Sequence, residues 1–241
     1  MPDVGTILLA AGLGSRFGPE PKLLALLDGA PLVRHAAGAA LGARPRPVIA
    51  VLGAHADRVR AALAGLDLIH AVNPDYRLGL ATSLRAGLAA LPPSCSAAVV
   101  VLGDMPRVTA AHIDRLVEAF AGAAPLPVAV VPVQDGRRGN PVLLNLRRLA
   151  PDIARLQGDH GAGPLLRGRT DVLGSRAIPR RPSTSTRRPA SPPSAVTPSD
   201  GAPPRAQPSH PARYHVSSVA LSSAVSPLRV VRASARHRSE Q

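Results

Sequence analysis

Hydrophobic and polar positions follow two alternating patterns through the first 173 residues. Short uninterrupted apolar runs have the length of strands that are buried on both faces. Between them, apolar residues recur every three or four positions, as in helices that bury one side. In the last helical segment Ile113, Leu116 and Phe120 share a face, and the Thr109 that precedes it predicts an N-cap. These patterns predict strands at Thr6–Ala10, Pro47–Leu52, Leu68–Val72, Ala97–Leu102 and Pro127–Pro132, and helices at Pro31–Leu41, His55–Ala64, Gly79–Leu91 and Ala110–Ala121.

This alternation of strands with helices predicts βαβ units. The expected fold is therefore a Rossmann-like α/β domain, with a mostly parallel sheet and helices on both of its faces. In such sheets ligands bind beyond the carboxyl ends of the strands. The first and fourth predicted strands run into "AAGLGSR" and "LGDMP", so these two loops are the first candidates for chemistry.

The pattern stops near Leu173. From Gly174 to Gln241 the chain is dominated by Pro, Ser, Arg and Ala, with one weak apolar patch at Val216–Val225. Such a segment buries too little apolar surface to offset its ordering entropy, so residues 174–241 are predicted to be a disordered tail. The tail holds 11 Arg against two acidic residues, Asp200 and Glu240, and so carries most of the net charge of +14. The first 173 residues are only mildly basic, which suits a binder of phosphorylated small molecules.

Composition excludes several classes of protein. There is no Trp, and two Phe and two Tyr cannot supply a stacking platform for nucleic acid. Cys95 is the only cysteine, so an intramolecular disulfide and a Cys-rich zinc site are excluded. The first apolar stretch is too short for a signal peptide, and no run reaches the length of a membrane span. We therefore expect a cytoplasmic protein with neither a membrane nor a specific nucleic acid as partner.

The loop Ala11–Arg16 combines a glycine-rich turn with cations. Gly12 and Gly14 allow backbone N–H groups to converge on an anion, although an ordinary βα turn has the same composition. Arg16 and Lys22 favour a triphosphate ligand. Lys22 is the only lysine among 29 basic residues, and a compact ammonium suits a crowded phosphate better than a planar guanidinium does.

Other polar residues in conspicuous turns are weaker candidates. Asp104 follows a buried strand and is suited to Mg²⁺, although a turn carboxylate is also common there. Asn73 and Ser83 flank a turn that leads into a helix, where they could contact a base or simply cap the turn. Arg138 and Asn140 lie in "GRRGNPV", which reads as a hairpin-like turn into a strand, near a ligand edge or merely solvated.

In their order along the chain these motifs are more specific than any one alone. The set LAAGLGSRFG…PKLL, NPDYRLGLATSL, LGDMP, GRRGNPV and LQGDHGAGPLL resembles the MobA-like nucleotidyltransferase family, and within it the molybdenum cofactor cytidylyltransferases. The resemblance covers Val4 to Leu173. It implies a GT-A-like domain that uses Mg²⁺ and transfers a nucleoside monophosphate to the phosphate of molybdopterin, with release of pyrophosphate. The implied partners are CTP (or GTP), a molybdopterin-type acceptor, and a molybdoenzyme or its chaperone.

The resemblance also implies roles at matching positions. It makes Lys22, Arg16 and Asp104 the catalytic residues, with Lys22 on the α-phosphate and Asp104 on the metal. The first loop reads Leu9-Ala10-Ala11-Gly12, as in the cytidylyl-transferring group, and so favours CTP. Residues expected at the nucleotide or acceptor are Ala11, Gly12, Gly14, Ser15, Asn73, Ser83, Arg138 and Asn140.

The sequence departs from the family in two places. After Leu173 the family's last strand and its Asp-rich segment are missing, and Gly163 stands where an arginine is common. The domain over residues 1–173 is thus expected to lack its final strand and a metal-holding carboxylate. The chain has 28 Arg to one Lys, which indicates a GC-rich gene. GC-rich codons that are read out of frame yield mostly Arg, Pro, Ser and Ala, so we hypothesise that residues 174–241 are a frameshifted ending. A genuine disordered basic arm would have the same composition.

Three functional hypotheses remain open at this point. The first is nucleotidyl transfer to molybdopterin, with transfer to another phosphorylated acceptor such as a sugar phosphate as its close alternative. The second is a relative that binds nucleotide without turnover. The third is a nucleic-acid-binding protein that acts through its Arg-rich tail, which would bind polyanions weakly and without sequence preference.

Overall fold

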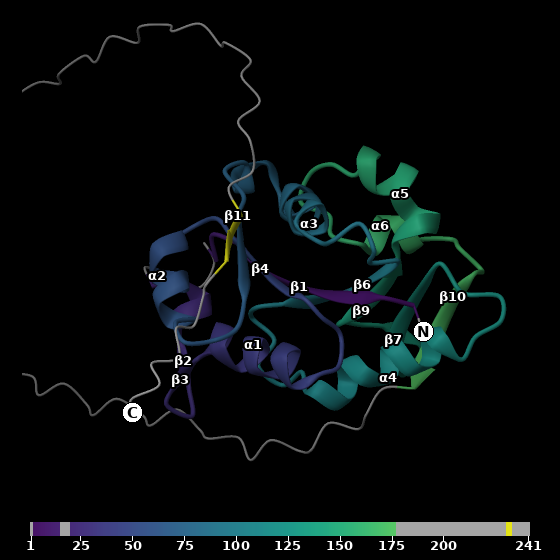
Figure 1. Ribbon diagram of the computed structural model, residues 1–241, viewed down its shortest axis with the longest axis horizontal. Coiled ribbons are helices and arrows are strands. Elements are labelled where there is room, and N and C mark those ends of the chain that lie inside the picture. The colour runs from purple at the N-terminus through teal and green to yellow at the C-terminus, as the bar shows by residue number, and fades with distance from the viewer. Residues whose placement is uncertain (1, 15–19, 177–229, 233–241) are drawn as a thin grey trace, which may run out of the picture. The chain divides into compact units, whose positions relative to one another are not determined.

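The structure is a computed structural model that describes residues 2–14, 20–176 and 230–232. Nine of the strands in these residues form one mixed sheet (Figure 1). The main path of the sheet has the order β10-β7-β9-β6-β1-β4-β5-β11, and β8 pairs with β7 at its side. The strands are β1 (Val4–Ala10), β4 (Val48–Leu52), β5 (Ile69–Val72), β6 (Ala97–Leu102), β7 (Ala129–Gln134), β8 (Arg137–Arg138), β9 (Val142–Asn145), β10 (Val172–Arg176) and β11 (Val230–Arg232).

Most of the long strands point the same way. β6, β1, β4 and β5 pair in parallel. β9 is antiparallel to both β6 and β7, so β7 and its parallel neighbour β10 share the direction of the central four. The mostly parallel α/β sheet expected from the sequence is thereby confirmed.

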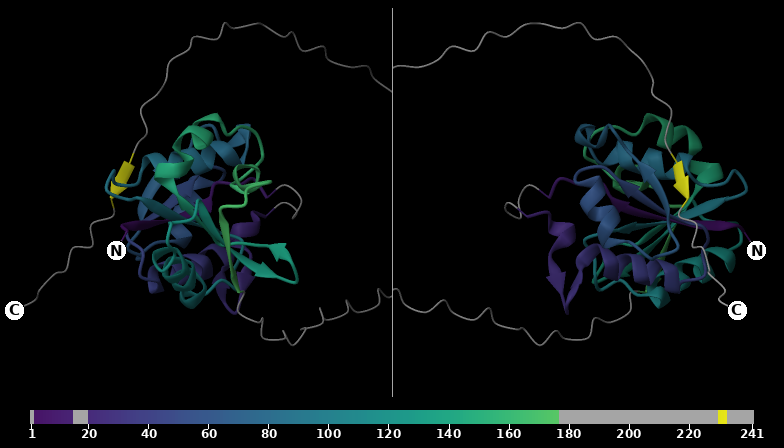
Figure 2. Two further views of the ribbon diagram at one scale, coloured as in Figure 1. Left: turned by 90° about the vertical axis from the view of Figure 1, so that its right-hand side faces the viewer. Right: turned by 60° about the vertical axis from the view of Figure 1, so that its left-hand side comes forward.

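Helices cover both faces of this sheet. The helices α1, α2 and α4 pack on one face, and α3, α5 and α6 pack on the other (Figure 1). Their bounds are α1 (Leu32–Gly42), α2 (Ala56–Ala62), α3 (Leu80–Ala89), α4 (Ala110–Ala121), α5 (Leu146–Arg155) and α6 (Gly163–Leu166). Two 3₁₀ helices, η1 (Lys22–Leu24) and η2 (Tyr76–Leu78), and a hairpin of β2 (Leu26–Leu27) and β3 (Ala30–Pro31) complete the described elements; the hairpin projects away from the main sheet (Figure 2).

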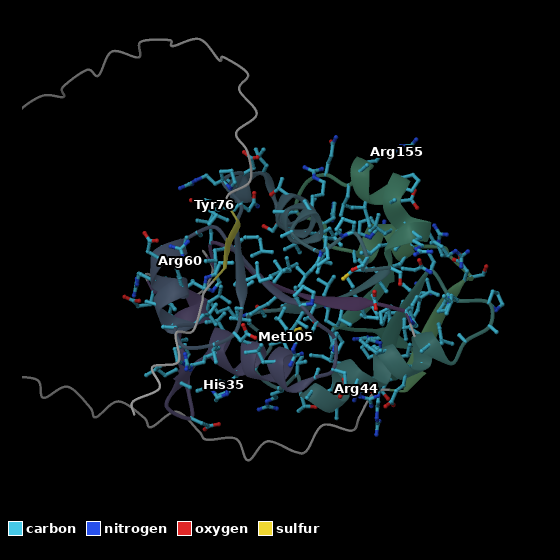
Figure 3. The ribbon with its side chains drawn as sticks, viewed as in Figure 1. His35, Arg44, Arg60, Tyr76, Met105 and Arg155 are labelled. Atoms are coloured by element: carbon cyan, nitrogen blue, oxygen red, sulfur yellow. The ribbon has the colours of Figure 1, made fainter. Side chains whose placement is uncertain are left out.

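The uninterrupted apolar runs follow from this two-sided burial. Along β1, Leu8 and Ala10 belong to the cluster under α1, α2 and α4, whereas Ile7 and Leu9 belong to the cluster under α3, α5 and α6. Because successive strand residues point to opposite faces, both parities of each strand must be apolar. Side chains fill both spaces between sheet and helices (Figure 3). The predicted cap of α4 is confirmed: the Thr109 side chain accepts from His112 N–H at 3.4 Å.

The structure adds elements that the pattern did not predict. The apolar period did not predict α5, which contains Pro151. The strand β10 continues to Arg176, three residues beyond the predicted domain boundary, and pairs with β7. Within the predicted tail, Val230–Arg232 forms β11, antiparallel to β5, because the outer edge of β5 offers unpaired backbone groups to an extended segment. The rest of that tail, including Val216–Val225, lies outside the described residues.

The topology brings two loops together. From β1 the chain proceeds outward through β4 to β5, then returns to place β6 on the other side of β1. The carboxyl ends of β1 and β6 therefore meet at the point where the strand order reverses, which is where ligands bind in doubly wound sheets.

Candidate active site

The glycine loop leaves β1 at this switch point. Ala11 is buried, and its carbonyl accepts from Ala54 N–H at 3.0 Å, which fixes the start of the loop against the loop after β4. Gly12 has open space where a Cβ would lie, so its backbone is accessible to a ligand. Gly14 has φ +63° and faces the Lys22 backbone, with 3.3 Å between a Cβ built there and Lys22 N. Glycine is required at this position by both the conformation and the contact.

Lys22 begins η1 just beyond that contact. The Leu24 N–H donates to the Pro21 carbonyl at 2.9 Å, which closes the turn around Lys22. The next residue, Leu23, is buried and lies close to Gly103, the residue before Asp104. An apolar anchor thus fixes the backbone of Lys22 beside the loop after β6.

Asp104 is presented by a tight turn at the end of β6. Gly103 N–H donates to the Leu9 carbonyl at 2.9 Å, and Met105 N–H donates to the Leu102 carbonyl at 3.2 Å. Met105, labelled in Figure 3, packs against the cluster under α1 and thereby holds the far side of the turn. The carboxylate of Asp104 is left at the surface of the cavity, where its Oδ2 lies 2.6 Å from Lys22 Nζ.

Neither partner in this ion pair is buried. The Lys22 side chain is 40% exposed and the Asp104 side chain 35%. Solvent therefore screens the pair, and a ligand can reach both groups. Residues 82 apart in the sequence are joined here into one acid–cation pair beside a glycine loop.

Asn73 does not line the cavity but bonds to the start of α3, which forms part of its wall. Its side chain is buried, and its Nδ2 donates to Thr82 Oγ1 and to Ser83 Oγ, both at 2.9 Å. Its Oδ1 accepts from Asp75 N–H at 3.0 Å. With its amide committed to these bonds, Asn73 holds the first turn of α3 in place, and Ser83 is the member of this network that lines the cavity.

These elements enclose a cavity of about 650 Å³. Its wall combines the glycine loop, the Lys22–Asp104 pair, η2 and the start of α3. Tyr76 and Arg77 belong to this wall, and the Arg77 guanidinium lies 5.4 Å from the centre of the Tyr76 ring. The lining residues are Ala11, Gly12, Leu13, Gly14, Lys22, Tyr76, Arg77, Leu78, Gly79, Leu80, Ser83, Asp104 and Asp159.

A second cavity, of about 470 Å³, shares Leu80 with the first. Strand side chains make most of its wall apolar, with Arg138, Asn140 and Arg167 as the polar members. The Arg138 guanidinium donates to the Leu166 carbonyl at 2.7 Å, which ties the β8 segment to the end of α6. The lining residues are Leu9, Leu80, Val100, Leu102, Val131, Arg138, Gly139, Asn140, Val142, Gly161, Ala162, Gly163, Leu166 and Arg167.

The loop 158–163 contributes to both cavities. Its Asp159 lines the first, and Gly161, Ala162 and Gly163 line the second. Gly79, with φ +108°, lies directly against this loop: a Cβ there would be 2.3 Å from the Gly158 carbonyl carbon. The loop can pack this closely against the start of α3 only because Gly79 has no side chain.

The predicted site residues that the structure describes fall into three groups. Ala11, Gly12, Gly14, Lys22, Ser83 and Asp104 line the first cavity, whereas Arg138 and Asn140 line the second. Asn73 lies behind the first, and Ser15 and Arg16 lie outside the described residues. The sequence reasoning did not single out Tyr76, Arg77, Leu80 or Asp159, although the glycines around Asp159 mark a loop built for close contact.

Two other titratable side chains with shifted pKa values, Cys95 and His70, line neither cavity. Burial raises the pKa of the Cys95 thiol, and the Asp3 carboxylate adds to the rise, so the thiolate is disfavoured. Burial lowers the pKa of His70, whose Nε2 has no hydrogen-bond partner within the described part of the chain.

The described residues contain no cluster of three or more His, Cys, Asp or Glu side chains that could hold a metal ion. None of the described helices has both the length and the apolar character needed to cross a membrane.

Comparison with known proteins relates this architecture to enzymes. Residues 6–173 match the family described as MobA-like NTP transferase domain. The bifunctional protein GlmU of Kineococcus radiotolerans is 42% identical over 119 residues, which cover 48% of this chain and 24% of that protein. The chain therefore spans about a quarter of the length of this relative.

Solved structures give the same picture over more of the chain. Rv0371c from Mycobacterium tuberculosis H37Rv superimposes with a TM-score of 0.63 and 29% identity, over 73% of this chain and 88% of that one. Its complex with manganese gives 0.59 and 28% over the same shares. A nucleotidyl transferase from Methanothermobacter thermautotroptrophicus gives 0.58 and 27%, over 68% of this chain and 80% of its own.

Proposed function

Because the chain belongs to the family of MobA-like NTP transferase domains, we propose that it transfers CMP from CTP to the phosphate of molybdopterin and releases pyrophosphate. The observation that carries the proposal is the Lys22–Asp104 pair beside the glycine loop, in a cavity that adjoins a second, mostly apolar one. Two adjacent cavities suit a reaction between two substrates.

In this proposal the triphosphate binds in the first cavity. The exposed backbone of Gly12 and the turn at Gly14 supply N–H groups to phosphate oxygens. The ammonium of Lys22 leaves Asp104 and moves to the α-phosphate, where negative charge grows during transfer. An oxygen of the acceptor phosphate bonds to the α-phosphorus as the bond from that phosphorus to the bridging oxygen breaks. Pyrophosphate carries away the electron pair of the broken bond.

The donor set of the first cavity fits a divalent cation. Carboxylate oxygens together with phosphate oxygens are the ligands that Mg²⁺ prefers, and Asp104 would hold it. When bound, the ion neutralises charge on the phosphates. The manganese complex of the similar Rv0371c supports a divalent cation of this kind.

The second cavity supports an acceptor with a flat ring. Leu9, Val100, Leu102, Val131 and Val142 offer no hydrogen-bonding side chains to a ring lined with hydroxyls. Its polar members, Arg138, Asn140 and Arg167, could orient a polar edge or a phosphate. The flat faces of a pterin ring can lie against these aliphatic side chains while its polar edge meets the polar members, so this lining favours molybdopterin. A sugar phosphate is the second candidate acceptor, because the family is defined by NTP transfer and not by one acceptor.

The test is incubation of the full chain with CTP, GTP or ATP, a divalent cation and either molybdopterin or a panel of sugar phosphates. We expect pyrophosphate and a CMP–molybdopterin product with CTP. A sugar-nucleotide product would select the second candidate. Nucleotide binding without release of pyrophosphate in the presence of any acceptor would identify a relative that has lost turnover and would refute the proposal.

A further inference from the structure

Among the residues that the structure describes, Asp159 is the one acidic residue besides Asp104 that lines the first cavity. It lies between Gly158 and His160, on an exposed loop 55 residues after Asp104, and belongs to neither loop that the topology places at the switch point. Its presence in a pocket with Lys22 and the glycine loop is a finding of the three-dimensional structure alone.

The position of this loop is tightly determined. The Ala81 N–H donates to the Gly158 carbonyl at 3.1 Å. A Cβ on Gly79 would be 2.7 Å from Asp159 N, and a Cβ on Gly161 would be 3.0 Å from the Leu80 side chain. Backbone contacts on both sides of Asp159 therefore fix its Cα against the first turn of α3, and Asp159 is one of the residues that line the cavity.

A carboxylate in this position opposes the ligand unless a cation intervenes. A triphosphate is a polyanion, and two acidic residues in the wall of its cavity repel it and weaken its binding. Among the described residues, Lys22 is paired with Asp104, Arg77 lies over the Tyr76 ring, and no ion pair involves Asp159. A divalent cation reverses this repulsion, since it binds carboxylate and phosphate oxygens together.

We infer that Asp159 is the second carboxylate that holds the divalent cation of the nucleotide, acting with Asp104. The inference rests on the proposed function of the first cavity. The second carboxylate of the metal site then comes from residues 158–163, and not from an acidic segment after Leu173. Since the same loop also lines the second cavity, it becomes part of the catalytic site.

The test measures Mn²⁺ binding to the full chain by electron paramagnetic resonance, once with CTP and once with inorganic tripolyphosphate. Because loss of a group that merely supports a metal ligand already costs roughly 10–100-fold, we expect Asp159→Asn to weaken Mn²⁺ binding at least tenfold with both probes. Asp67→Asn is the matched control, since Asp67 is exposed and precedes β5 at the amino end of the sheet. Asp104→Asn serves as the reference for a lost ligand.

The outcomes separate this inference from the proposed function. If the unaltered protein binds no Mn²⁺ with either probe, the proposed function fails. If it binds Mn²⁺ and Asp159→Asn binds equally well, only the role of Asp159 is overturned. Weaker binding with CTP but not with tripolyphosphate would assign Asp159 to the nucleoside and also overturns the inference. Should Asp159→Asn melt well below the control, Asp159→Ser is measured instead, with proton relaxation expected to report one additional water on the bound Mn²⁺.

Discussion

Removal of the Lys22 charge should strengthen metal binding to the free protein and at the same time reduce turnover of the nucleotide. The Lys22 ammonium lies 2.6 Å from the Asp104 carboxylate, so a divalent cation must compete with it for that carboxylate. In the proposed mechanism, the same ammonium moves to the phosphates when nucleotide binds. Lys22→Met keeps most of the side-chain length while removing the charge, and therefore separates the two states.

The magnitude follows from the exposure of the pair. Both side chains are more than a third exposed, and exposed ion pairs are worth about 0.2–1 kcal/mol. Removal of the competing charge should thus strengthen Mn²⁺ binding to the free protein by up to roughly fivefold. With CTP present, loss of one electrostatic stabiliser of the transition state should reduce kcat by roughly 10²–10³-fold.

The assay is a Mn²⁺ titration followed by electron paramagnetic resonance without nucleotide, together with pyrophosphate release under saturating CTP. Lys22→Arg is the control, because it retains the competing charge but places a planar fork where a point charge is required, and so should not restore turnover. If Lys22→Met weakened Mn²⁺ binding to the free protein, the competition would be disproved. Unchanged turnover would remove Lys22 from the mechanism.

Three further outcomes test other parts of the structure. CTP should outcompete GTP in pyrophosphate release, and Ala11→Gly, which removes a methyl group from the cavity wall, should narrow that preference; better use of GTP by the unaltered chain would contradict this reading. Gly79→Ala should destabilise the fold by roughly 1–3 kcal/mol in a urea titration, whereas Gly65→Ala, also at positive φ but facing open space, should cost less. Burial and then the nearby Arg115 lower the pKa of His112 from its usual 6.5, so the unfolded chain takes up the proton first and the melting temperature should fall as pH drops through and below that value. His112→Gln, which keeps an acceptor at the third position of α4, should flatten part of that pH dependence.

The elements of the fold were largely accessible from periodicity because each strand is buried on both faces. Leu8 and Ile7 must both be apolar when helices cover both sides of β1, and this produces the uninterrupted runs that predicted the sheet. The α5 helix escaped because Pro151 interrupts its pattern. The pattern did not predict β11, because this strand forms by pairing with the edge of β5, which is far away in the sequence, and local composition does not reveal such a pairing.

Some residues of the candidate site could be predicted from the sequence, but their arrangement could not. Each of Lys22 and Asp104 could be singled out from its loop, but their ion pair required the reversal of strand order between β1 and β6. Asn73 lies in a suggestive turn, yet its amide points into a buried network, a direction that sequence spacing does not encode. Asp159 reaches the cavity through contacts of Gly79 with a loop some 80 residues away, and no periodic signal marks such contacts.

The common wall of the two cavities also bears on inhibition. Leu80 lines both, so one molecule could fill them together: a nucleotide joined to a flat apolar ring by a short linker. Once the nucleotide half is bound, the ring half meets its cavity at an effective concentration in the millimolar range, and the combined affinity can exceed that of either half by roughly 10²–10⁴-fold. Because Leu80 lines both cavities, a linker has to pass close to it, and Leu80→Ala should change the Kd of the linked molecule more than the Kd of either half.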